Sequence, residues 1–218
     1  MAGARLDARS RRRIYRITLL NLDIMHSDTK PLVVLIGDSI RMAYQATVQS
    51  ELDGAAEIWA PEVNGGDSRN VLLHLDEWIF ARRPHIVHVN CGLHDVKRDF
   101  ARGQFQVPVE EYAQNVRQIL TRLATESEAK VFWATTTPVD EKLHHENKDF
   151  DRFEADVDAY NAAAVALCWE LGVDVDDLYS VVGKSGKADL LKADGVHFVE
   201  EGSQILGREV AAFIRAHL

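Results

Sequence analysis

The feature that most constrains the fold is a regular alternation of short apolar runs with longer amphipathic segments along residues 31–218. Leu32–Ile36 is apolar without interruption, which is typical of a parallel strand covered on both faces. Residues 40–53 then place apolar side chains at helical spacing. Similar strand-like runs at 85–92 and 130–138 are each followed by a helical pattern. Strands that alternate with helices predict a parallel sheet with helices on both faces.

The remaining elements complete a five-stranded arrangement. Shorter strands are expected at 56–62 and within 173–182. Further helices are expected near 69–82, 109–125, 150–171 and 200–217. Because parallel strands need right-handed crossovers, this order favours a flavodoxin-like α/β fold, a three-layer α/β/α sandwich around a five-stranded parallel sheet.

Composition narrows the class of protein. The chain of 218 residues is 46% hydrophobic and 27% charged, as is usual for a soluble globular domain. Its formal net charge of −9 argues against a nucleic acid or an anionic membrane as partner. No run reaches the roughly 18 apolar residues of a membrane span. Cys91 and Cys168 lie in apolar runs, so we expect buried thiols rather than a disulfide.

The first segment of the chain differs from the rest. We expect residues 1–24 to be a disordered or loosely attached extension and residues 25–218 to form a single domain. Arg11–Arg13 followed by an apolar stretch weakly resembles a secretory signal. However, Arg16 and Asp23 interrupt that stretch, and no small-residue cleavage site follows it. A cytoplasmic location is therefore expected.

Four short polar blocks occur where strands end or the last helix begins. Gly37–Ser39 follows the first strand, Asn64–Ser68 the second and Gly92–Asp95 the third, while Asp194–His197 precedes the last helix. The first three share the carboxyl edge of a parallel sheet, where ligands of open α/β sheets bind. The fourth reaches that edge if the last loop packs over the strand ends.

The residue types in these blocks match the needs of acyl transfer. A serine hydroxyl is a weak nucleophile until a base takes its proton, and His197 is the candidate base for Ser39. Asp194, in the same loop, can hold the other ring nitrogen and set its tautomer. The backbone N–H groups of Ser39 and Gly66 suit an oxyanion, since glycine permits close approach. A Gly-Asp-Ser turn alone is equally compatible with an ordinary helix cap, so the prediction depends on the ordered set.

These blocks, in this order, resemble those of the SGNH/GDSL hydrolase superfamily, which comprises serine esterases and lipases on a flavodoxin-like fold. The resemblance spans about residues 31–218, with Gly37–Ser39 as the first block, Gly66 in the second, and Asp194 and His197 in the last. It implies that Ser39 is the nucleophile and that His197 and Asp194 complete a catalytic triad.

The third block departs from the family pattern, because His94 stands where an oxyanion-binding Asn is usual. A neutral imidazole still offers one N–H, so we expect His94 to complete the oxyanion hole formed by Ser39 and Gly66. The alternative is that His94 only forms a hydrogen bond within its loop.

The expected function is therefore hydrolysis of a carboxylic ester through an acyl-enzyme intermediate. The expected substrate is a small-molecule or glycan ester, such as an acetyl group on a polar or carbohydrate alcohol, and no metal or organic cofactor is expected. A lipase, thioesterase or acyltransferase remains an alternative on the same site, as does a non-catalytic module that binds an acylated ligand. A nucleotide-binding protein of the flavodoxin type is disfavoured, because no Gly-rich phosphate loop is present. His144 and His145 lie beside glutamates that could ligate a metal, but a solvated loop is the favoured interpretation.

Overall fold

Five parallel strands form the central sheet of residues 30–218, the part of the chain that this computed structural model describes. In chain order they are β1 (Leu32–Ile36), β2 (Glu57–Trp59), β3 (Ile86–Val89), β5 (Lys130–Ala134) and β7 (Asp174–Asp176). Their order in the sheet is β2-β1-β3-β5-β7. The chain thus runs from β1 to the edge strand β2, and then crosses to the other side of β1 to form β3, β5 and β7. The predicted five-stranded parallel sheet is confirmed. The expectation for residues 1–24 concerns a segment outside the described residues.

The central strands β1 and β3 are covered on both faces, whereas the edge strands β2 and β7 are partly exposed. In β1, Val33 to Ile36 are fully buried, and β1 pairs with β3 in a register that places Ile36 beside Val89. An uninterrupted apolar run is what such a position requires. Cys91 and Cys168 are free, buried thiols in this core, as predicted.

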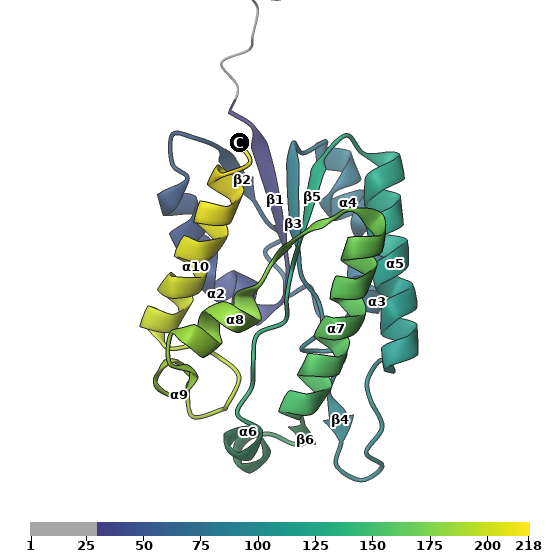
Figure 1. The fold of residues 1–218 in the computed structure, drawn as a ribbon, viewed down its shortest axis with the longest axis vertical. Helices are drawn as coiled ribbons and strands as arrows, with labels where there is room; N and C mark the ends of the chain where they lie inside the picture. Colours follow the sequence, from purple (N-terminus) through teal and green to yellow (C-terminus); the bar gives the residue numbers. More distant parts are fainter. Residues whose placement is uncertain (1–29) are drawn as a thin grey trace, which may run out of the picture. The chain divides into compact units, whose positions relative to one another are not determined.

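Helices cover the two faces of the sheet and complete the three layers (Figure 1). On one face lie α2 (Ser39–Glu51), α8 (Leu178–Lys184) and α10 (Glu200–Arg215), and on the other lie α3 (Ser68–Leu73), α5 (Val109–Glu126) and α7 (Glu154–Leu171). Each long helix turns its apolar stripe to the sheet, which stabilises it by burial. Among residues 30–218, no helix combines the length and apolar character that crossing a bilayer requires.

The helix expected over 69–82 is divided into three pieces. After α3 come α4 (Leu75–Trp78) and a single 3₁₀ turn, η1 (Phe80–Arg82). The break falls at His74, whose Nδ1 lies 2.8 Å from the carbonyl oxygen of Asn70 and whose ring stacks on Trp78. The expected apolar face is nevertheless the buried one, since Val71, Leu75 and Trp78 are all buried.

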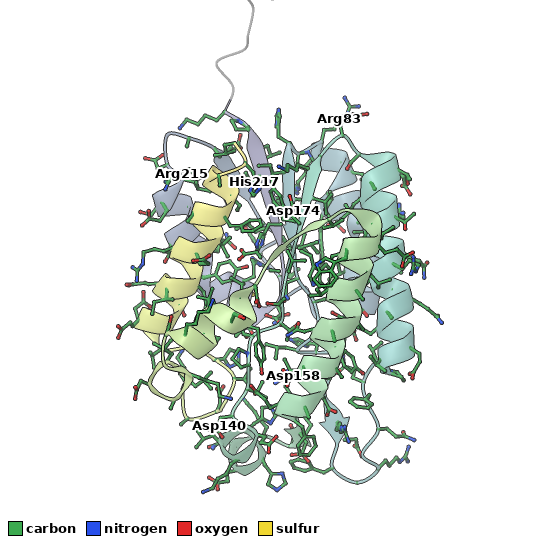
Figure 2. All side chains as sticks on the ribbon, in the orientation of Figure 1. Arg83, Asp140, Asp158, Asp174, Arg215 and His217 are labelled. Carbon is green, nitrogen blue, oxygen red and sulfur yellow. The ribbon has the colours of Figure 1, made fainter. Side chains whose placement is uncertain are left out.

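The segments that follow β3 and β5 meet beyond the carboxyl ends of the strands. β4 (Arg98–Asp99) pairs antiparallel with β6 (Phe150–Asp151), and α6 (Glu141–Asn147) lies beside them (Figure 1). Because Phe150–Asp151 is a strand, α7 begins at Glu154 rather than at the expected 150. The short helix α9 (Lys187–Leu190) precedes the last loop. Figure 2 shows Asp140 at this end of the sheet and Asp174 at the opposite end.

Candidate active site

Ser39 lies where β1 turns into α2. Asp38 caps the helix, since its Oδ1 accepts the N–H of Ile40 at 2.9 Å. Ser39 is the first residue of α2, and the first N–H groups of a helix have no partner within the helix. The local sequence therefore places a half-buried hydroxyl at the carboxyl edge of the sheet, beside the positive end of a helix dipole.

His197 and Asp194 reach Ser39 from the other end of the chain. Ser39 Oγ lies 2.8 Å from His197 Nε2, and His197 Nδ1 lies 2.6 Å from Asp194 Oδ2. With a proton on Nδ1, the lone pair of Nε2 faces the hydroxyl, which is the orientation a general base needs. The three residues expected to act together are thus in one line of hydrogen bonds.

The carboxylate of Asp194 is held in its ionised form. Its Oδ1 accepts the backbone N–H groups of His197 at 2.9 Å and Val196 at 3.1 Å. Burial raises the pKa of Asp194, but the hydrogen bonds from the side chain and backbone of His197 and from Val196 outweigh it and keep the pKa below its ordinary value. Asp194 therefore remains an acceptor for the imidazole N–H across the physiological range.

The loop that carries Asp194 and His197 is fastened to the segment after β5. The carbonyl oxygen of Gly195 accepts the N–H of Asp140 at 2.8 Å, and Asn147 Nδ2 donates to the carbonyl of Ala193 at 2.9 Å. Gly195 has a φ of +70°, and a Cβ there would lie 2.4 Å from the Asp140 carbonyl oxygen. Only glycine fits this turn, because the two backbones approach so closely.

The second block lies beside the first, but the backbone N–H that we expected it to offer to an oxyanion already has a hydrogen-bond acceptor. The N–H of Gly65 donates to the carbonyl of Gly37 at 3.0 Å, which ties the two blocks together. The N–H of Gly66, expected to face an oxyanion, donates instead to Asn64 Oδ1 at 2.8 Å. Asn64 lines the cavity next to Ser39, so the N–H of Gly66 is paired with a side chain of the cavity wall.

The third block is joined to the second by Asp95. Both of its carboxylate oxygens accept the N–H of Ser68, at 3.0 and 3.1 Å. Burial raises the pKa of Asp95 to about 7, although the hydrogen bonds from Ser68 lower it. The neighbouring His94 lines the cavity together with Ser39 and His197. Burial lowers the pKa of His94 to about 4, so at neutral pH its imidazole is uncharged and carries one N–H.

A cavity of about 430 Å³ opens beside Ser39. Apart from His94, no residue from the segments that follow β3 and β5 was assigned to this site from the sequence. The pairing of β4 with β6 brings these segments together. The lining side chains that they contribute, beyond His94, are Leu93, Lys97, Lys148, Asp149, Phe150 and Arg152.

The histidine pair on α6 does not form a metal site. His144 is fully buried, and its Nε2 accepts a hydrogen bond from Arg152 Nη1 at 3.0 Å. The favoured expectation of a solvated loop is therefore wrong for His144, although His145 is exposed. Within residues 30–218, no three His, Cys, Asp or Glu side chains are grouped so that they could hold a metal ion.

A parallel α/β/α sandwich that brings Ser, His and Asp together at the carboxyl edge of its sheet has the architecture of a serine hydrolase. The model of the GDSL-like Lipase/Acylhydrolase family matches residues 35–205 of this chain, a range that includes Ser39 and His197. The chain therefore belongs to the GDSL-like lipase/acylhydrolase family.

Two plant proteins resemble the chain over most of its length. GDSL esterase/lipase WDL1 of Oryza sativa subsp. japonica is 30% identical over 207 residues, which cover 85% of this chain and 78% of that protein. GDSL esterase/lipase CPRD49 of Arabidopsis thaliana is 27% identical over 209 residues, covering 88% and 81% respectively.

Solved structures share the fold. The lipase/acylhydrolase from Enterococcus faecalis superposes with a TM-score of 0.74 at 21% identity, covering 86% of this chain and 97% of that one. The acetyl xylan esterase AlAXEase superposes with a TM-score of 0.68 at 19% identity, covering 84% and 99% respectively. With the family membership, these likenesses identify an SGNH-type ester hydrolase.

Proposed function

We propose that this enzyme hydrolyses a carboxylic ester with a short acyl group, such as acetyl, on a polar or carbohydrate alcohol, through an acyl-enzyme formed at Ser39. The observation that carries the proposal is the hydrogen-bonded line from Ser39 Oγ to His197 Nε2 at 2.8 Å and from His197 Nδ1 to Asp194 Oδ2 at 2.6 Å. That line supplies a nucleophile, a base and a group that orients the base.

The reaction proceeds in two steps. In the first, His197 Nε2 takes the proton of Ser39 Oγ while Oγ bonds to the ester carbonyl carbon, and the carbonyl oxygen becomes negatively charged. His197 then gives the proton to the leaving alcohol as its C–O bond breaks, which leaves an acyl group on Ser39. In the second step, His197 takes a proton from water while the water oxygen bonds to the acyl carbon. His197 then gives that proton to Ser39 Oγ as the bond between Oγ and the acyl carbon breaks and the carboxylic acid leaves. Asp194 stabilises the imidazolium in both steps.

The negative oxygen needs donors that are already in place, each worth about 3 kcal/mol in the transition state. The N–H of Ser39, at the start of α2, and the ring N–H of His94 supply two of them. The N–H of Gly66 supplies a third once Asn64 has moved, because Asn64 Oδ1 now accepts from it. Substrate binding is therefore coupled to a rotation of the Asn64 side chain.

The character of the cavity supports a short acyl group. Its lining includes the charged side chains of Lys97, Lys148, Asp149 and Arg152, next to which a long aliphatic chain gains little from burial. Among proteins of the same fold, AlAXEase is an acetyl xylan esterase. Both considerations favour an acetyl ester of a polar alcohol over a long-chain lipid.

The proposal is tested with a fluorophosphonate probe and an ester series. We expect covalent labelling at Ser39, located by peptide mass spectrometry, and none in Ser39→Ala. Across p-nitrophenyl esters from acetyl to decanoyl, kcat/KM should fall as the acyl chain lengthens, and acetylated sugars should be deacetylated. A rise in kcat/KM with chain length would support the lipase alternative instead, and a folded chain that resists labelling would contradict the role of Ser39.

A further inference from the structure

The lining of the cavity beside Ser39 has more cationic than anionic side chains, although the protein as a whole is acidic. Three cationic side chains line it, those of Lys97, Lys148 and Arg152, although the whole chain carries a formal net charge of −9. Two carboxylates, Asp38 and Asp149, lie in the same lining. Of these, Asp38 caps α2 through its Oδ1. A general excess of basic residues therefore does not explain the cations in this cavity.

Arg152 is a buried cation that forms no hydrogen bond or ion pair with a carboxylate of the described residues. Arg152 is only 6% exposed. Its Nε donates to the carbonyl oxygen of Leu93, and its Nη1 donates to His144 Nε2. None of the ion pairs among residues 30–218 involves Arg152. Both hydrogen-bond partners are uncharged, since burial keeps His144 neutral by lowering its pKa to about 4. The carboxylates of Asp38 and Asp194 are near enough to favour its charge, but neither forms a hydrogen bond with it, and burial outweighs both and lowers the pKa of Arg152 to about 10. A buried guanidinium without a hydrogen-bonded carboxylate is costly for folding.

One face of this guanidinium remains available to a ligand. Within residues 30–218, Nη2 makes no hydrogen bond, and it is not among the polar atoms sealed from solvent. The two bonds from Nε and Nη1 fix the plane of the group, so Nη2 is held in place at the cavity wall. A fixed guanidinium with a free N–H edge is suited to a carboxylate or a phosphate.

Lys97 adds to the same wall a second cation that has no ion-pair partner within residues 30–218. Its Nζ lies 4.8 Å from the centre of the Phe150 ring, and no ion pair among the described residues involves it. Burial lowers the pKa of Lys97, and repulsion from Arg152 lowers it further, although the nearby carboxylates of Asp67, Asp38 and Asp149 raise it. An anion bound between the two cations would relieve their repulsion. Lys148 differs, because its Nζ lies 3.3 Å from Asp194 Oδ2.

We propose that Arg152 and Lys97 bind an anionic group, a carboxylate or a phosphate, that the ester substrate carries close to its scissile bond. The inference rests on the proposed ester hydrolysis at Ser39 and defines its substrate class further. The anion confers specificity through binding, so its loss should raise KM more than it lowers kcat.

The test compares esters that differ only in one anionic group. An acyl-side pair is 4-nitrophenyl hydrogen succinate and its neutral methyl ester. An alcohol-side pair is an O-acetylated methyl glucuronide with a free carboxylate and the same compound as its methyl ester. A phosphate pair is acetylated glycerol phosphate and acetylglycerol. In at least one pair we expect kcat/KM of the anionic member to exceed that of the neutral member by about tenfold, and the advantage to shrink at high ionic strength.

Variants assign this preference to the two cations. Lys97→Met and Arg152→Gln should lower the anionic-to-neutral ratio of kcat/KM toward one, and Arg152→Lys should retain part of it. The matched control is Lys184→Met, which removes one positive charge from an exposed position on α8, away from the cavity lining. This control should leave the ratio unchanged. If Arg152→Gln fails to fold, Lys97→Met and Arg152→Lys still show whether the anionic-to-neutral ratio of kcat/KM depends on the two cations.

The outcomes separate the two proposals. If the neutral member of every pair is hydrolysed as well as the anionic one, anion recognition is refuted while ester hydrolysis stands. If no ester is hydrolysed and Ser39 is not labelled, the proposed function fails, and calorimetry of succinate and inorganic phosphate with the Ser39→Ala variant decides the anion site. Binding that is lost in Ser39→Ala/Lys97→Met supports the site, and no detectable binding overturns it.

Discussion

Lys148 Nζ lies 3.3 Å from Asp194 Oδ2, the same oxygen that lies 2.6 Å from His197 Nδ1. The carboxylate proposed to orient the base is therefore shared with an ammonium group. Because the ammonium attracts part of the negative charge, Asp194 stabilises a protonated His197 less than it would alone. Lys148 follows α6 in the chain, so the segment after β5 reaches the proposed catalytic line directly.

We predict that Lys148→Met moves the acidic limb of the kcat/KM profile to higher pH by about half a unit, since side chains this exposed to solvent interact weakly. Without the ammonium, Asp194 holds the imidazolium more strongly, so a higher pH is needed to free the base. The measurement is kcat/KM for p-nitrophenyl acetate against pH. Lys142→Met, an exposed lysine on α6, is the control and should leave the limb in place. A shift to lower pH would contradict the shared-carboxylate interpretation.

We predict that His94→Ala lowers kcat by about 10²–10³-fold with little change in KM, because an oxyanion donor acts mainly in the transition state. His94→Asn, which keeps a side-chain N–H donor, should lose less than about tenfold. Both variants are compared with the wild type in steady-state kinetics on p-nitrophenyl acetate. If His94→Ala turned over as fast as the wild type, the remaining interpretation would be that His94 only forms a hydrogen bond within its loop.

The pKa of His94, lowered by burial to about 4, adds a second test of that residue. The ring is already uncharged at about pH 6 and remains so at higher pH. The loss caused by His94→Ala should therefore be the same at about pH 6 and about pH 8. A loss that grows sharply toward acidic pH would mean that the protonated ring acts instead.

We predict that Gly195→Ala destabilises the fold and lowers kcat more than tenfold, whereas Gly172→Ala only destabilises it. Both glycines have a φ of +70°, where alanine costs about 1–2 kcal/mol. A Cβ on Gly172 meets nothing within 4 Å. A Cβ on Gly195 would lie 2.4 Å from the carbonyl oxygen of Asp140 and 2.6 Å from the backbone nitrogen of His144. Relief of this overlap must displace the loop that carries Asp194 and His197. Urea unfolding and steady-state kinetics measure the two effects, and equal losses in both variants would argue against the clash.

We predict that Asp95 makes the stability of the protein fall as the pH rises from about 4 to about 7. Asp95 titrates near pH 4 in the unfolded chain, and burial raises its pKa in the fold to about 7. Its favourable contribution is therefore complete below about pH 4 and is lost as the buried carboxyl ionises, by an amount on the order of 4 kcal/mol.

The measurement is the free energy of unfolding of wild type and Asp95→Asn in urea across this pH range. The difference, wild type minus variant, should decline with pH and level off above about pH 7. Asp189→Asn, at an exposed position on α9, controls for the change in net charge and should show no such trend. Parallel curves for wild type and Asp95→Asn would show that Asp95 does not titrate differently in the fold.

By itself the sequence determined the sheet, the layers and the order of the polar blocks. Leu32–Ile36 could be predicted as a doubly covered strand because burial on both faces demands an unbroken apolar run, and helix faces follow from a spacing that a short window contains. The same local chemistry placed Ser39 at a helix start. Because parallel strands all end at one edge, Ser39, Gly66 and His94 had to come near one another.

Only the tertiary structure decided what surrounds Ser39. The antiparallel pairing of Arg98 with Asp151 joins two irregular segments and brings Lys97 and Arg152 to one cavity. Such short pairings leave no periodic signal in the sequence, since they depend on where distant loops meet after the sheet has formed. The hydrogen bond from the Gly66 N–H to the Asn64 side chain likewise depends on which rotamer Asn64 adopts, and the residue type alone does not specify that rotamer. Local periodicity encodes the scaffold, whereas packing between loops sets the chemistry of the site.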